Sequence, residues 1–253
     1  MKTDVAIMYS GGLDSLIAYH YAKHKGLNPV CINVGFGQPY DKKEQDSIAA
    51  LGKWSPHIER IDMGDLFSLI QSRLTNQIIP SRNVLLATIG GMFASKVWIN
   101  ALDGEQNGKE HDKSERFFSD TSKLLTFTND FFQPYTVVES PFAHMTKGDT
   151  IKWALAHGIP KEVLFETSSC YDHNQKKCSV CLTCVKRYLA FLEAGIIEPG
   201  YHIDPLSSDY FKEIFVGISK AATNRDYIRF SQRRIEGFLL MLASDIYKEA
   251  RGL

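Results

Sequence analysis

The sequence lacks several features that would assign it to a class at once. Its 29 basic and 29 acidic residues cancel, so no excess of charge points to nucleic acid or to a membrane surface. No apolar run approaches the length of a membrane span, and the first residues lead into a short strand-like run instead of a signal-peptide pattern. Internal repeats are also missing. We therefore expect a cytoplasmic globular protein with neither a membrane partner nor a general nucleic-acid partner.

Two common nucleotide-binding fingerprints are absent as well. The first glycine-rich loop is not followed by Lys-Ser or Lys-Thr, so it is not a Walker A motif. It also lacks the G-x-G-x-x-G spacing of dinucleotide-binding folds. The loop instead reads Ser10-Gly11-Gly12-Leu13-Asp14-Ser15 and lies between an apolar run at residues 5–9 and a helical pattern. This position predicts a tight strand-to-helix turn.

The chemistry of this turn suits a phosphate group. Gly11 and Gly12 let the backbone approach an anion closely, and the first N–H groups and positive dipole end of the following helix favour negative charge. Ser10 and Ser15 add hydroxyl donors. Asp14 repels phosphate unless it contacts a backbone N–H or holds Mg²⁺. An ordinary turn capped by Asp14 is the alternative, but the position after the first strand favours a nucleotide with a metal ion.

Strand-like and helix-like segments alternate along the first half of the chain, which predicts βαβ units and a parallel sheet. Strands are expected at residues 5–9, 29–34, 58–62, 97–102 and 135–139. Helices are expected at residues 13–25, 42–54, 84–96, 117–132 and 147–157. Right-handed crossovers place the ligand at the carboxyl ends of the strands. The predicted fold class is α/β, a twisted parallel sheet with helices on both faces and a metal-bound helical region near the carboxyl terminus.

We expect three regions, a nucleotide-binding α/β domain at 1–165, a four-cysteine site at 166–195 and a helical extension at 196–253. In the extension, apolar residues recur at helical spacing from about 225 to 251. This helix packs on its own domain in the simpler interpretation. A homodimer contact or a docking face for another protein is the alternative.

The segment at 103–115 is almost free of apolar residues. Such composition is typical of a solvated surface loop. A lid over the ligand is the alternative, because the segment leaves the end of a parallel strand.

Four of the five cysteines fall within fifteen residues. Cys178, Cys181 and Cys184 are spaced three residues apart, and Cys170 precedes them by eight. In a reducing compartment such a cluster favours a metal over disulfides. Four thiolates close a tetrahedral Zn²⁺ site and leave no open position for chemistry, so we expect a structural zinc ion. An iron–sulfur cluster, redox thiols and disulfides are the alternatives.

Five further motifs follow the Ser10–Ser15 loop along the chain. They are Gly37-Gln38 with Glu44, Pro80-Ser81-Arg82-Asn83, Lys147, Glu166-Thr167-x-x-Cys170-Tyr171 and the cysteine motif that ends at Arg187. The loop matches the PP-loop signature of the ATP pyrophosphatases. In this order, which is collinear over about residues 3–190, the motifs together resemble the 7-cyano-7-deazaguanine synthase family, a branch of those enzymes.

The resemblance implies an ATP-dependent ligase on a PP-loop α/β fold with a structural zinc ion. Family members activate 7-carboxy-7-deazaguanine with ATP and use ammonia to form an amide and then the nitrile. ATP, Mg²⁺ and Zn²⁺ are the implied cofactors. The implied ATP-binding residues are Ser10, Gly11, Gly12, Leu13, Asp14, Ser15, Gln38 and Arg82. The implied catalytic residues are Arg82 and Lys147, as cationic clamps on phosphate or carboxylate, and Asp14.

The chain departs from the family pattern where the substrate is expected to bind. Between residues 101 and 117, only Asp112 and Phe117 clearly keep the family's pattern. Gly35 stands where a strand end usually carries an aspartate, and Ser81 replaces a usual glycine. The nucleotide-binding part of the family's site is therefore expected to be retained, and the substrate-binding part is expected to be altered. The implied substrate contacts are Gln106, Asp112 and Arg187.

Our main prediction is a nitrile-forming synthase whose small-molecule partners are the deazapurine carboxylate and ammonia. One alternative is a related ligase that passes the acyl group to an amine of a partner protein, as in relatives from bacterial antiviral gene clusters. Another is a non-catalytic ATP-binding module. A tRNA-modifying enzyme is disfavoured, because the charges balance and the clustered cysteines are assigned to metal.

The cysteine assignment predicts a measurable metal content. Elemental analysis of the purified protein should find about one zinc ion per chain. In Cys181→Ser the zinc should be lost and the chain should unfold, because structural zinc contributes directly to folding. Full zinc retention in Cys181→Ser would contradict the ligand set.

Overall fold

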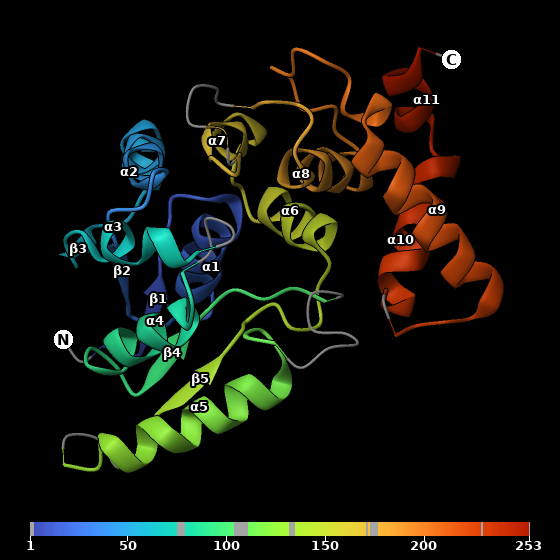
Figure 1. Cartoon of the computed structure of the whole chain (residues 1–253). Coiled ribbons are helices and arrows are strands. Elements are labelled where there is room, and N and C mark those ends of the chain that lie inside the picture. Colours follow the sequence, from blue (N-terminus) through green and yellow to red (C-terminus); the bar gives the residue numbers. More distant parts are fainter. Residues whose placement is uncertain are drawn as a thin grey trace. The chain divides into compact units, whose positions relative to one another are not determined.

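The computed structural model describes residues 3–74, 79–103, 111–131, 135–170, 172, 177–228 and 230–252 (Figure 1). Contacts divide the chain into two units. The first comprises the described residues within 1–101 and 110–141, and the second those within 102–109 and 142–253. Gln106, which the resemblance implies in substrate binding, lies outside the described residues.

The first unit is built on five parallel strands in the order β3-β2-β1-β4-β5 (Figure 1). The strands are β1 (Val5–Met8), β2 (Pro29–Gly35), β3 (Ile58–Asp62), β4 (Lys96–Trp98) and β5 (Val137–Glu139). β1 is fully buried in the middle of the sheet, as the short apolar runs predict for a parallel sheet covered on both faces. The predicted parallel sheet is confirmed.

Side chains of β1 alternate between two apolar layers. Ala6 and Met8 belong to a core cluster with Phe67, Ala87 and Phe118 from the helices on one face. α1 packs on β1 and β2, and none of its residues belongs to that cluster. Helices therefore cover both faces, as predicted. The helical segments of this unit are α1 (Leu13–His24), α2 (Asp41–Ala50), η1 (Gly52–Trp54), α3 (Leu66–Ile70), η2 (Gln71–Arg73), α4 (Arg82–Gly91) and α5 (Glu115–Thr128).

Several predicted boundaries in this unit were wrong. The helix expected to reach residue 96 ends at Gly91, and the strand expected at 97–102 spans only Lys96–Trp98. The helix expected from 117 begins at Glu115, because the Ser114 hydroxyl caps it by accepting from the Phe117 N–H at 3.1 Å. The carboxyl end of the segment 103–115 is therefore the start of α5.

The second unit is helical. Its segments are α6 (Lys147–Ala156), α7 (Lys161–Glu166), α8 (Leu182–Glu193), η3 (Pro205–Ser207), α9 (Asp209–Asn224), α10 (Gln232–Ala243) and α11 (Asp245–Arg251). Apolar side chains of α8, α9 and α10 form one core cluster, which includes Leu189, Ile218 and Phe238. No helix within the described ranges is long and apolar enough to cross a membrane.

The single helix expected from about 225 to 251 is a wrong prediction. Arg225 ends α9 in the left-handed region (φ 52°), and Ser231 and Ser244 cap two separate helices. The Ser231 hydroxyl accepts from the Arg234 N–H and the Ser244 hydroxyl from the Tyr247 N–H. Helical spacing alone did not reveal these caps, because the apolar positions continue across the breaks.

Candidate functional site

The Ser10–Ser15 loop joins β1 to α1 and is closed by its own hydroxyls. The Ser10 N–H donates to the Ser15 hydroxyl at 3.3 Å, and that hydroxyl donates to the Gly12 carbonyl at 3.0 Å. The Gly12 N–H in turn lies 3.4 Å from the Ser10 hydroxyl. Within the part of the chain that the structure describes, no side chain caps the start of α1. The turn therefore presents a helix amino terminus at the carboxyl edge of a parallel sheet, which is a common anion site.

Gly11 allows α2 to pack directly on this loop. Its φ is +70°, and a Cβ there would lie 2.8 Å from the Ile48 side chain and 3.0 Å from the Glu44 carbonyl. The buried Ser47 hydroxyl donates to the Gly11 carbonyl at 2.7 Å. A side chain at position 11 would separate the loop from α2, so the packing of α2 requires a glycine at this position independently of phosphate binding.

A polar network crosses the carboxyl ends of β1, β2 and β3. The Asn33 amide donates to the Tyr9 carbonyl at 2.9 Å and to the Glu44 carboxylate at 3.3 Å. The Arg60 guanidinium donates to the Asn33 side-chain oxygen and, at 2.6 Å, to the Asp41 carboxylate. These contacts join the residue before the loop to β3 and to the start of α2.

Gly35 leaves room for the Arg60 guanidinium. A Cβ at position 35 would lie 2.0 Å from an Arg60 nitrogen. The family usually has an aspartate at this strand end. In this chain the position is Gly35, and the Arg60 guanidinium of the neighbouring strand β3 occupies the space at the end of β2. Sequence reasoning noted the glycine but missed Arg60, because the two residues are brought together only by strand pairing.

Glu44 is the titratable group at the centre of this edge. Burial raises the pKa of Glu44 to about 7, against the opposing effects of the Asn33 hydrogen bond and of Arg82 and Arg60. Asp41 raises that pKa further. The pKa of this carboxyl group is thus shifted toward neutral pH by burial, and the neighbouring cations limit the shift.

Two further predicted ATP residues hold neighbouring loops. The buried Gln38 side chain accepts from the Phe36 N–H at 2.7 Å and orders the turn after β2. Arg82 is the first residue of α4 and donates to the Tyr40 hydroxyl at 3.0 Å. Ser81 precedes it at φ 57°, which explains why a glycine is usual at this position. Asn83 is buried, and its side-chain amide donates to the Asp112 carbonyl at 3.0 Å. This hydrogen bond holds the Asp112 backbone next to α4, and the implied contact of Asp112 with substrate stays a prediction.

Lys147 lies in the second unit as the first residue of α6. It lies within a capping box formed by Thr146 and Asp149. The Thr146 hydroxyl accepts from the Asp149 N–H at 3.1 Å, and the Asp149 carboxylate accepts from the Thr146 N–H at 3.0 Å. This pair fixes the start of α6 and the position of Lys147 on it. The catalytic and ATP-binding roles of Lys147, Arg82, Asp14 and the loop stay predictions.

The four clustered cysteines converge as expected. Sulfur atoms of Cys170, Cys178, Cys181 and Cys184 all lie within 4.8 Å of one another. A tetrahedral ion about 2.3 Å from each sulfur needs sulfurs roughly 3.8 Å apart, so a small adjustment accommodates it. N–H groups of Asp172 and Cys178 donate to the Cys170 sulfur. This soft donor set fits a thiolate-bound metal.

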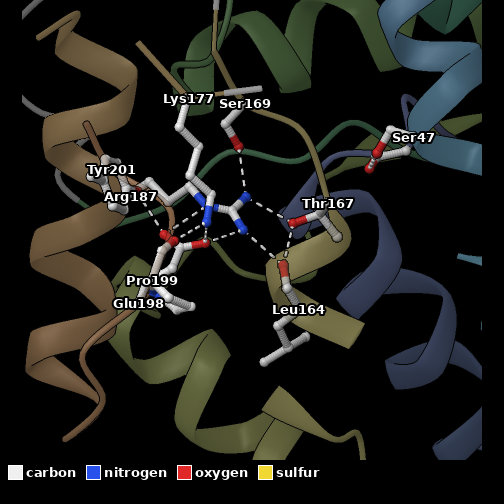
Figure 2. Close-up of polar contacts among 10 residues, drawn as sticks. Ser47, Leu164, Thr167, Ser169, Lys177, Arg187, Glu198, Pro199 and Tyr201 are labelled. Atoms are coloured by element: carbon white, nitrogen blue, oxygen red, sulfur yellow. Dashed lines mark hydrogen bonds and ion pairs between the residues drawn. The ribbon is translucent and has the colours of Figure 1, made fainter. Parts of the chain in front are cut away.

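Arg187, three residues after Cys184, belongs to a buried ionic cluster with Glu198 and Lys177 (Figure 2). Arg187 is 2% exposed and contacts the carboxylate of Glu198, also 2% exposed, at 2.7 Å. Lys177 reaches the same carboxylate at 2.8 Å, and the Tyr201 hydroxyl donates to it at 2.6 Å. Burial alone would raise the pKa of Glu198, but Arg187 and Lys177 outweigh this effect and hold the pKa below its usual range.

The remaining donors of Arg187 are also engaged. They contact the Thr167 hydroxyl at 2.7 Å, the Ser169 hydroxyl at 3.3 Å and the Leu164 carbonyl at 2.7 Å (Figure 2). The guanidinium thereby joins the end of α7 to α8 and to the segment after it. Through these contacts Arg187 stabilises the local structure. Its implied contact with substrate stays a prediction.

The parallel sheet and the loop between β1 and α1 together define an α/β fold of the PP-loop type. The family model described as queuosine biosynthesis protein QueC matches residues 48–195, more than half of the chain. The chain belongs to this family.

The chain is also similar in sequence to proteins named 7-cyano-7-deazaguanine synthase. The chain is 27% identical over 222 residues to a 7-cyano-7-deazaguanine synthase of Thermoplasma volcanium, covering 79% of this chain and 90% of the relative. It is 28% identical over 222 residues to the synthase of Thermoplasma acidophilum, covering 78% and 91%. Among solved structures, it is similar to a U34-tRNA thiolase, NcsA, from Methanococcus maripaludis, with 14% identity, a TM-score of 0.45 and coverage of 96% and 73%.

The buried ionic cluster predicts a large loss of stability in Glu198→Gln. This change leaves Arg187 and Lys177 buried without their negative partner, so the free energy of unfolding should fall by about 3–5 kcal/mol in urea denaturation at neutral pH. Asp209→Asn is the matched control, because its exposed carboxylate pairs only with Lys212 on the surface, and it should unfold close to the wild type. An equal loss in both variants would contradict the role of the cluster.

Proposed function

We propose that the chain is an ATP-dependent ligase that converts 7-carboxy-7-deazaguanine and ammonia into 7-cyano-7-deazaguanine. The observation that carries this proposal is the closed Ser10–Ser15 loop at the start of α1, in a chain of the QueC family. Relatives covering about four fifths of the chain are named 7-cyano-7-deazaguanine synthases.

The reaction requires activation because a carboxylate is a poor electrophile. A carboxylate oxygen attacks the α-phosphorus of ATP, pyrophosphate leaves, and an acyl adenylate forms. Ammonia then attacks the acyl carbon, AMP leaves and a proton is lost, which gives the amide. The amide oxygen then attacks the α-phosphorus of a second ATP with release of pyrophosphate, and loss of AMP and of both amide protons gives the nitrile. The protein has to hold phosphates, bring a second anion beside them and stabilise the charge of the leaving pyrophosphate.

The residue roles follow from the loop and its neighbours. Backbone N–H groups and hydroxyls of the Ser10–Ser15 loop would bind phosphate, with Gln38 ordering the adjoining turn. Arg82 and Lys147 would stabilise charge on the phosphates or the substrate carboxylate. Mg²⁺, held with the help of Asp14, would neutralise phosphate charge.

The cysteine cluster would hold Zn²⁺ as a structural ion. Four thiolates leave no coordination position for a substrate, which supports a structural role over a catalytic one. The adjoining Arg187–Glu198 pair would stabilise the same segment. We further propose that the protein acts in the cytoplasm. A protein amine as acyl acceptor and a homodimer stay predictions from the sequence.

Product analysis tests the function directly. With ATP, Mg²⁺, 7-carboxy-7-deazaguanine and ammonium, we expect pyrophosphate, AMP and the nitrile, separated by liquid chromatography and mass spectrometry. Pyrophosphate release that depends on the deazapurine but yields no nitrile would favour transfer to another amine. No nucleotide turnover with any carboxylate would contradict the proposal.

Variants of the cationic clamps test their roles in the same assay. Arg82→Ala and Lys147→Ala should each lower kcat by about 10²–10³-fold, because each removes charge stabilisation that grows as pyrophosphate leaves. Lys42→Ala is the matched control, since this lysine is exposed on α2 and should keep wild-type activity. A wild-type kcat in Arg82→Ala would contradict the proposed role of Arg82 in the reaction.

A further inference from the structure

The loop at 178–181, which carries two of the four clustered cysteines, holds a serine in a backbone conformation that serine rarely adopts. Ser179 has a φ of +70°, in the left-handed region, where any residue with a Cβ is strained and glycine is not. Its side chain is nevertheless 0% exposed. A strained backbone that persists at a buried position is held by surrounding contacts, so the contacts of this hydroxyl indicate what the strain serves.

The Ser179 hydroxyl binds a segment that follows α8. It accepts hydrogen bonds from the His202 N–H at 3.0 Å and from the Ile203 N–H at 3.2 Å. A glycine at position 179 would relieve the backbone strain, but it would leave both N–H groups without this acceptor. The two hydrogen bonds therefore give a physical reason for a side chain at this position.

Lys177, on the other side of Cys178, binds the same segment. Its ammonium group donates to the Pro199 carbonyl at 2.8 Å and pairs with the Glu198 carboxylate at 2.8 Å (Figure 2). Lys177 is 7% exposed, so both contacts are largely shielded from water. Residues 198–203, which we call the clasp, thus hold the chain on both sides of Cys178. The clasp lies beyond residues 48–195, which the family model matches.

The loop that the clasp holds also orients the sulfur atoms. The Cys178 N–H donates to the Cys170 sulfur at 3.3 Å, and the Cys181 N–H donates to the Cys178 sulfur at 3.3 Å. Removing a group that orients a metal ligand typically lowers metal affinity by about 10–100-fold. Because the clasp fixes the backbone on both sides of Cys178, it also fixes the direction of the Cys178 sulfur.

We propose that the clasp retains the metal ion of the cysteine site, with Ser179 as the positioning residue that holds the clasp closed. This inference rests on the proposed zinc site and adds that the carboxyl-terminal extension sets how long the ion stays bound. The Cys178 sulfur cannot turn away from the ion unless residues 177 and 179 move, and their movement breaks the contacts with the clasp.

The test is the rate at which the zinc-loaded, full-length chain releases zinc to an excess of the chromophoric chelator 4-(2-pyridylazo)resorcinol. Ser179→Ala should release zinc about tenfold faster than the wild type, with an unchanged circular dichroism spectrum. Ser207→Ala is the matched control, because this exposed serine of the same unit donates to the Asp204 carbonyl of its own turn, and it should release zinc at the wild-type rate. A wild-type rate in Ser179→Ala would overturn the proposal.

A second variant separates the hydroxyl from the backbone strain. If the left-handed conformation were the only constraint at position 179, Ser179→Gly would retain zinc at least as long as the wild type, because glycine adopts this conformation without strain. We expect Ser179→Gly to release zinc severalfold faster than the wild type and more slowly than Ser179→Ala. Release at or below the wild-type rate would contradict the role of the hydroxyl.

Hydrogen exchange shows whether the clasp itself opens. In zinc-loaded Ser179→Ala, the amides of His202 and Ile203 should exchange about tenfold faster than in the wild type, whereas the amides of α9 should exchange at the wild-type rate. Faster exchange of the clasp without faster zinc release would show that its contacts are merely structural, and this result would also overturn the proposal.

Metal content distinguishes a failure of the clasp from a failure of the zinc site. Wild-type protein that binds zinc, together with unchanged release from Ser179→Ala, would contradict the clasp alone. Wild-type protein that binds no metal would contradict the zinc site and the clasp with it.

Discussion

The contact between α2 and the Ser10–Ser15 loop is the constraint on which the proposed nucleotide site depends. The Ser47 hydroxyl binds the Gly11 carbonyl, and Gly11 adopts a positive φ with no room for a side chain. The parallel β1–α1–β2 unit brings α2 to the carboxyl edge of the sheet, and Asn33 and Glu44 complete the connection. Together these contacts fix the loop before any ligand binds, which is the preorganisation that phosphate chemistry requires.

The sheet and the loop could be predicted because their signals are local. Short apolar runs, a glycine pair and a helical pattern occur in sequence order, and the cysteine spacing brings four thiols together on its own. The Arg60–Gly35 contact could not be predicted from spacing, since it depends on the register of β2 against β3. The separate helices α10 and α11 were missed because two serine caps interrupt a pattern whose apolar period continues.

The different environments of Arg82 and Arg187 could not be predicted from the sequence. Arg82 and Arg187 look alike in the sequence, and each belongs to a family motif. In the structure, Arg82 starts α4 beside Tyr40, whereas Arg187 is buried against Glu198 eleven residues later in the chain. Whether a guanidinium can donate hydrogen bonds to a ligand depends on how deeply the side chain is buried and on the groups it already contacts. A sequence motif gives neither property. The extension supplies the Glu198 carboxylate from a segment beyond the residues that the family model matches.

Activation of a carboxylate by adenylation is the central claim of this account. It is tested most directly with 7-carboxy-7-deazaguanine labelled with ¹⁸O in its carboxylate, followed by mass spectrometry of the nucleotide product. Adenylation of the carboxylate predicts one ¹⁸O atom in AMP, because the bond between the acyl carbon and the bridging oxygen breaks when ammonia attacks. Unlabelled AMP, or label in inorganic phosphate, would contradict it.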